Sequence, residues 1–125
     1  MMNSRDPKLI ALLFNECITN QNLEGLSALM SEDHTFIDHT GAISRPKDFM
    51  INAWKSFFAA CPKYKNTFSR LESASSTVSI VGHAFWSEEK PFDPVLWRAR
   101  IENDLVAEWR IYEDTPENRK FLNLA

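Results

Sequence analysis

The chain has few glycines and cysteines, no long apolar run and no excess of charge of one sign. Its three glycines are too few to build a glycine-rich phosphate loop. No apolar run approaches the roughly 20 residues that span a bilayer, and residues 1–6 do not resemble a signal peptide. The 14 basic and 17 acidic residues are scattered, which disfavours a nucleic-acid surface and an anionic-membrane patch. We therefore expect a cytoplasmic protein whose partners are small molecules or a second copy of itself.

The length and composition suit one globular domain, residues 1–125. Of its residues, 44% are hydrophobic and 12% aromatic, which is enough for a real core. Cys17 and Cys61 each fall on the apolar side of an expected helix, so buried free thiols are favoured over a disulfide or a metal pair. No serine or cysteine lies in a nucleophile-elbow motif.

Hydrophobic periodicity predicts helices first and strands last. Ser44 is expected to cap the third helix, with Pro46 in its first turn, and a turn or short helix is expected near Pro116. The order indicates an α+β fold with the helices gathered on one face of a curved, mostly antiparallel sheet. The expected helices are 7–20, 22–30 and 46–61, and the expected strands are 33–39, 63–73, 76–87, 95–102 and 105–113.

Alternation in the last strands predicts which side chains face the helices. For both inward sets to do so, position 101 must pair with 105 across a turn at 102–104, which sets Trp97 opposite Trp109 and Arg98 opposite Glu108. In the strand before them, Gly82 and Ala84 are small and could either leave a cavity or merely accommodate the tryptophan rings. The inward set is Val78, Ile80, Gly82, Ala84, Trp86, Trp97, Ala99, Ile101, Leu105, Ala107, Trp109 and Ile111.

The opposite face of this sheet carries apolar, aromatic and arginine side chains. Such a mixture is favoured in protein interfaces, so we expect a homodimer that pairs through this face. The residues concerned are Val81, His83, Phe85, Tyr112, Arg98, Arg100 and Arg110.

The strand at 33–39 carries four ionisable side chains. Alternation places His34, Phe36 and Asp38 on one face and turns His39 to the other, towards solvent or a subunit contact. If the first face looks into an apolar cavity, Asp38 is a buried carboxylate with a raised pKa and a candidate proton-transfer base. If it looks at water, Asp38 is an ordinary strand-end residue. His34 could act as an acid, a base or an orienting partner, or it could be a structural histidine.

Four segments together resemble a known family: 23–33 (LEGLSALMSED), 36–41 (FIDHTG), 54–58 (WKSFF) and 108–114 (EWRIYED). They are similar to the SnoaL-like branch of the nuclear-transport-factor-2-like superfamily over nearly the whole chain. The resemblance implies a cystatin-like cone, in which a curved sheet wraps around the N-terminal helices, and relatives commonly pair through the outer sheet face. This scaffold serves isomerases, cyclases, dehydratases, hydrolases and non-catalytic binding modules, so it specifies the fold better than the function.

A comparison with ketosteroid isomerase, in the same superfamily, favours the cavity interpretation of Asp38. Asp38 falls where that enzyme has its proton-abstracting aspartate. The tyrosine that stabilises the oxyanion corresponds to Phe14, which cannot donate a hydrogen bond, and its protonated aspartic acid falls near Trp97, whose indole can. Because oxyanion donors supply much of the transition-state stabilisation, these departures make steroid isomerisation a poor fit.

The sequence therefore predicts a small protein that binds a mainly apolar organic ligand. One hypothesis is a cofactor-independent isomerase, cyclase or lyase that uses Asp38 as general base, with His34 assisting; the alternative is a non-catalytic ligand-binding or dimeric interaction domain. We expect no cofactor. We also expect no metal site, because strand alternation separates His39 from His34 and Asp38. An open cavity of at least about 300 Å³ that exposes Asp38 would favour the first hypothesis, and one filled by tryptophan rings the second. The expected pocket residues are Phe14, Phe36, Trp54, Phe58, Trp97 and Trp109.

Overall fold

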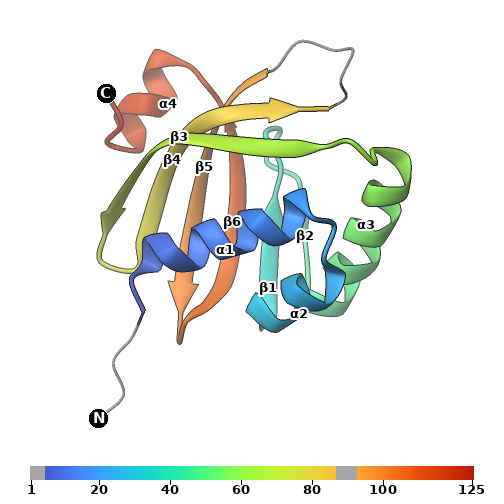
Figure 1. Cartoon of the computed structure of the whole chain (residues 1–125). Coiled ribbons are helices and arrows are strands. Elements are labelled where there is room, and N and C mark those ends of the chain that lie inside the picture. Colours follow the sequence, from blue (N-terminus) through green and yellow to red (C-terminus); the bar gives the residue numbers. More distant parts are fainter. Residues whose placement is uncertain (1–4, 87–92) are drawn as a thin grey trace.

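The computed structural model describes residues 5–86 and 93–125, and it has the expected α+β architecture (Figure 1). Three N-terminal helices lie on one side of a six-stranded sheet of order β2-β1-β6-β5-β4-β3, in which only the β1–β6 pair is parallel. Residue 87, the last of one expected strand, lies outside the described residues. The elements are α1 (Pro7–Thr19), α2 (Leu23–Leu29), β1 (Met30–Ile37), β2 (Ile43–Ser44), α3 (Lys47–Ala60), β3 (Lys65–Ala74), β4 (Thr77–Phe85), β5 (Asp93–Glu102), β6 (Leu105–Glu113) and α4 (Pro116–Phe121).

A local capping signal explains where α1 begins, but no such signal explains where α3 begins. The Asp6 carboxylate accepts the backbone N–H of Lys8 at 2.9 Å, ahead of Pro7 at the start of α1. The expectation that Ser44 caps α3 is wrong. Ser44 instead pairs with Phe36 in the short strand β2, which the sequence reading missed, and α3 starts after Pro46 without a side-chain cap.

The β5–β6 hairpin keeps both tryptophans on the expected face through a different register. Asn103 and Asp104 both have positive φ (53° and 61°) and form a two-residue turn, not the expected three-residue turn. A register shift then leaves Ala107 unpaired, so Trp97 lies opposite Ile111 rather than Trp109. The bulge restores the inward direction of the rest of β6. Both tryptophans therefore belong to the core as predicted, whereas Val106 takes the inward position and the expectation that Leu105 and Ala107 face inward is wrong.

Arg98 and Glu108, which were expected to lie opposite each other, still meet, but diagonally across the two strands. Arg98 lies opposite Arg110 rather than Glu108, yet its guanidinium nitrogen Nη2 is 3.3 Å from Glu108 Oε2.

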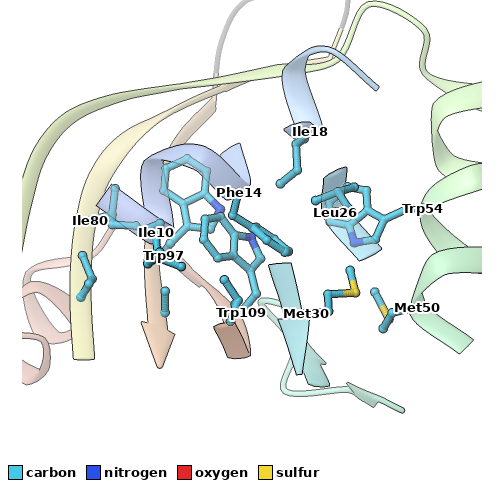
Figure 2. Close-up of a cluster of buried hydrophobic side chains, with 14 of the residues drawn as sticks. Ile10, Phe14, Ile18, Leu26, Met30, Met50, Trp54, Ile80, Trp97 and Trp109 are labelled. Carbon is cyan, nitrogen blue, oxygen red and sulfur yellow. The ribbon is translucent and has the colours of Figure 1, made fainter. Parts of the chain in front are cut away.

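The main core lies between α1 and the sheet (Figure 2). Phe14 of α1 packs on Trp109, with ring centroids 4.7 Å apart. Gly82 accommodates the core, because a Cβ there would lie 2.1 Å from the Thr67 carbonyl oxygen and 3.0 Å from the Trp97 ring. At Gly82, therefore, the small residue accommodates a packed tryptophan ring and does not leave a cavity.

The outer face of the sheet is partly covered by the chain itself. Leu122 and Leu124, which follow α4, pack with Val81, Leu96 and Tyr112 in a second buried cluster. We call residues 115–125 the C-terminal cover. Two residues counted as exposed apolar area, Val81 and Tyr112, are therefore buried within one chain. The homodimer stays a prediction, but the outer face exposes less apolar area than the sequence analysis assumed.

The two cysteines are free, as predicted, although both are half-buried rather than buried. Within the described part of the chain, no helix combines the length and the apolar character needed to cross a membrane.

Candidate functional site

A cavity of about 630 Å³ opens between α3 and the sheet. Helix α3 supplies one wall, and the other walls come from the C-terminal ends of β1, β4 and β6 and the start of β5. Its polar lining residues are Asp38, His39, Ser44, Asp93 and Glu113. The others are Phe36, Met50, Ala53, Trp54, Phe57, Tyr64, Ala84, Trp86, Pro94, Val95, Trp97, Ile111 and Tyr112.

Aromatic rings in edge-to-face contact form much of the wall. Trp54 meets Phe36 at a centroid distance of 6.1 Å and Phe57 at 5.7 Å. Phe57 also meets Tyr64 at 4.8 Å and Trp86 at 5.7 Å, so these rings hold one another in place. Burial raises the pKa of Tyr64 to about 12, so its phenol stays protonated at neutral pH.

Two buried indole N–H groups belong to the cavity residues and have no acceptor. Trp54 is 7% exposed and Trp97 is 1% exposed, and Nε1 of each is without a hydrogen-bond partner among the described residues. A buried donor that lacks an acceptor is unfavourable by about 1–3 kcal/mol. Neither nitrogen has appreciable accessible surface, so both N–H groups lie within the packed wall and do not face the open space of the cavity.

Asp38 lines the cavity, but its carboxylate organises the turn after β1. Its Oδ1 accepts the backbone N–H of Thr40 at 2.8 Å, the Thr40 hydroxyl at 2.5 Å and the backbone N–H of Ala42 at 3.1 Å. The Thr40 hydroxyl bond is the largest cause of a lowered Asp38 pKa, and it outweighs the small desolvation effect. The prediction of a raised pKa is therefore wrong. Asp38 is anionic at neutral pH and a weaker base than expected.

His34 is separated from the cavity by the core. Its side chain is fully buried, Nδ1–H donates to the Val106 carbonyl oxygen at 2.6 Å, and its ring lies 5.8 Å from that of Phe14. Nε2 has no partner among the described residues. Burial lowers the His34 pKa, so the imidazole is neutral at neutral pH. The structure thus does not bring His34 to the cavity beside Asp38.

The structure divides the expected pocket residues into two groups. Phe36, Trp54 and Trp97 line the cavity, whereas Phe14, Phe58 and Trp109 are buried in the core and do not line it. The period of a helix or a strand gives the face of a side chain but not its depth, which explains why both groups were expected in the pocket.

Several lining residues were missed at the strand ends. His39 follows the end of β1, so strand alternation no longer sets its direction, and it lines the cavity instead of pointing away. Asp93 and Glu113 continue the inward alternation of Val95 and Ile111, a signal that could have identified them. Ala84 also lines the cavity, so the expectation that a small residue of β4 leaves a cavity holds there.

Across residues 5–86 and 93–125, no group of three His, Cys, Asp or Glu side chains is placed to bind a metal ion.

Solved structures with the same fold share little sequence with this chain. A cystatin-fold protein from Novosphingobium aromaticivorans has a TM-score of 0.78 at 14% identity, over 88% of this chain and 100% of its own. A candidate SnoaL-like polyketide cyclase from Shewanella putrefaciens has a TM-score of 0.75 at 14% identity, over 98% and 89%. An epoxide hydrolase from Mycobacterium tuberculosis has a TM-score of 0.75 at 12% identity, over 94% and 89%.

No protein-family model and no curated protein sequence matches the chain. The structural likeness nevertheless shows the fold that the four sequence segments implied. The chain has the cystatin-like α+β cone of SnoaL-like and nuclear-transport-factor-2-like proteins.

Proposed function

We propose that the chain binds a small, mainly apolar organic molecule in the cavity beside α3. The observation that carries the proposal is the open, aromatic-lined space of about 630 Å³, within the roughly 300–1,000 Å³ that is usual for ligand pockets. Its rings are fixed by edge-to-face contacts, so binding would need little reorganisation. Similar structures that carry enzyme names, a polyketide cyclase and an epoxide hydrolase, are consistent with a ligand site in this fold.

A neutral fluorescent probe tests the proposal. We expect N-phenyl-1-naphthylamine to bind with enhanced emission and Ala84→Leu to lower its affinity at least about tenfold, because added side-chain atoms occupy cavity space. Ala28→Leu is the matched control, since Ala28 is exposed on α2 and does not line the cavity. Far-UV circular dichroism checks that both variants fold. Absence of probe binding, or equal affinity in the two variants, would refute the proposal.

A second function, proton transfer without a cofactor, is favoured by the position of Asp38 in the cavity wall. The anion can accept a proton from a bound carbonyl-type substrate, as an isomerase, cyclase or lyase would require. His34 has no part in this scheme, because it does not reach the cavity. The alternative is that the chain binds its ligand without catalysis, and the lowered Asp38 pKa makes that alternative stronger than the sequence suggested.

Asp38→Asn separates the two functions. The amide oxygen can still accept the Thr40 and Ala42 hydrogen bonds, so the turn is kept while the base is lost. Turnover of any substrate found should fall by roughly 10² to 10⁴, with ligand affinity and folding retained. Unchanged turnover in Asp38→Asn would leave binding as the function.

A further inference from the structure

The described wall of the cavity has four buried residues whose side chains end in a polar group: Trp54, Tyr64, Trp97 and Tyr112. The two indole nitrogens and the Tyr112 hydroxyl lie within the packed wall, with no appreciable accessible surface and no hydrogen-bond partner among the described residues. The Tyr64 hydroxyl is not closed off in this way, although Tyr64 as a whole is only 7% exposed. It is therefore the buried polar group to consider for direct contact with a bound molecule.

The described polar neighbours of Tyr64 leave its O–H available as a donor. A hydrogen bond with the Asn66 side chain opposes the rise in the Tyr64 pKa, which is the effect of a group that donates to the phenol oxygen. Asn66 Oδ1 has no partner among the described residues, so it does not accept the Tyr64 proton.

Asn66 is itself held in place by Asn15 of α1. Asn66 Nδ2–H donates to Asn15 Oδ1 at 3.2 Å, and Asn15 Nδ2–H donates to the backbone carbonyl oxygen of Asn66 at 3.1 Å. Both asparagines are buried, so this pair gives Tyr64 a fixed neighbour beneath the wall.

The ring of Tyr64 is fixed by aromatic neighbours. It meets Phe57 at a centroid distance of 4.8 Å and Trp86 at 5.0 Å, both edge to face. Burial raises the pKa of Tyr64 to about 12, so the hydroxyl keeps its proton at neutral pH. A donor that is already ordered loses little conformational entropy when a ligand engages it.

We propose that Tyr64 is a specificity-determining residue of the cavity, whose hydroxyl opens into the space and donates a hydrogen bond to an acceptor oxygen of the ligand. The ligand class is then a neutral oxygen-bearing molecule, such as a ketone, ester or ether, with its apolar body against the aromatic wall. This inference rests on the proposed function, because it assumes that the cavity binds a small molecule.

Two matched probes isolate the acceptor oxygen. 2-Acetonaphthone carries a carbonyl oxygen, and in 2-isopropenylnaphthalene a CH₂ group replaces that oxygen with little change of shape. Their affinities are measured by displacement of N-phenyl-1-naphthylamine. Tyr64→Phe removes the hydroxyl and keeps the ring, so it should weaken the ketone about fivefold and change the affinity for the alkene by less than about twofold.

Tyr112→Phe is the matched comparison. Tyr112 is 8% exposed, about as buried as Tyr64, but its hydroxyl lies within the packed wall. Its replacement should therefore change the affinities for the two probes by the same factor. Far-UV circular dichroism checks that both variants fold.

The carbonyl stretch of bound 2-acetonaphthone gives a readout that a purely structural role of Tyr64 would not move. Infrared difference spectroscopy should place this band at a lower frequency in the wild-type protein than in Tyr64→Phe, because a hydrogen bond weakens the C=O bond. If Tyr64→Phe does not fold, the wild-type band is compared with that of the free ketone in hexane, and we expect it at a lower frequency.

The outcomes distinguish this inference from the proposed function. Equal weakening of both probes by Tyr64→Phe would overturn the inference while ligand binding stands. An unshifted carbonyl band in the wild-type protein, or the same preference lost in Tyr112→Phe, would overturn it as well. The inference also fails if neither probe displaces the dye from a protein that binds it. Absence of dye binding would remove the proposed function and the inference with it.

Discussion

Replacing Leu124 with alanine removes a side chain that anchors the C-terminal cover to the outer sheet face. Leu124 is 0% exposed and packs in the cluster with Val81, Leu96 and Tyr112, and its carbonyl oxygen accepts Arg70 Nη1 at 2.9 Å. Fully buried Leu→Ala substitutions lower the free energy of unfolding by about 2–5 kcal/mol. We expect a loss near the lower end of this range, about 2 kcal/mol, because the cluster around Leu124 is small and the cavity left behind can partly close.

The assay is urea unfolding at neutral pH with Phe121→Ala as the control. Phe121 belongs to the same cover and is larger, but it is 65% exposed, so its replacement should change the free energy of unfolding by no more than about 0.5 kcal/mol. In thermal unfolding, the Leu124 variant should lose roughly 5–10 °C. Equal effects of the two substitutions would show that the cover does not pack on the sheet in solution, and the account of the buried outer face would be wrong.

The remaining predictions concern the core, pH and assembly. Gly82→Ala should lower the free energy of unfolding by about 1–3 kcal/mol in urea, because the new Cβ meets the backbone of Thr67; a change below about 0.5 kcal/mol contradicts the close approach. His34 has a folded-state pKa below the 6.5 of the unfolded chain, so the unfolded state binds the proton first and stability falls as pH drops below 6.5. The wild-type protein should lose up to about 1.4 kcal/mol per pH unit more than His34→Gln, and parallel pH profiles would exclude this cause. We expect a homodimer, so light scattering at micromolar concentration should give twice the chain mass of 14.4 kDa, and a monomer mass would contradict this prediction.

Alternation predicted the faces of Trp97 and Trp109 correctly, but not those of the residues that begin β6, nor how the hairpin sets the two faces. A three-residue turn and a two-residue turn followed by a bulge both keep Trp97 and Trp109 on one face. The sequence pattern cannot distinguish them, because it records only which side chains face inward. Asn103 and Asp104 are residue types that tolerate the positive φ of a two-residue hairpin turn, so the local sequence does favour the observed turn.

The site was less predictable than the fold for two physical reasons. The acidity of Asp38 depends on the path of residues 38–42, which brings the Thr40 hydroxyl to its carboxylate, and no periodicity encodes that path. The depth of a side chain depends on which helix covers it. Phe14 and Trp109 lie where α1 packs on the sheet, whereas Trp54 lies where α3 leaves space.

The parallel pairing of β1 with β6 has a consequence for the order of folding. It joins segments far apart in the chain, as the contact of His34 with Val106 across 72 positions shows, and closing so long a loop is entropically unfavourable until many contacts form together. The antiparallel hairpins β3–β4 and β5–β6 close short loops and can form early. The wall of the cavity that β1 provides should therefore be completed last, and hydrogen exchange during refolding should protect the amides of β1 after those of the two hairpins.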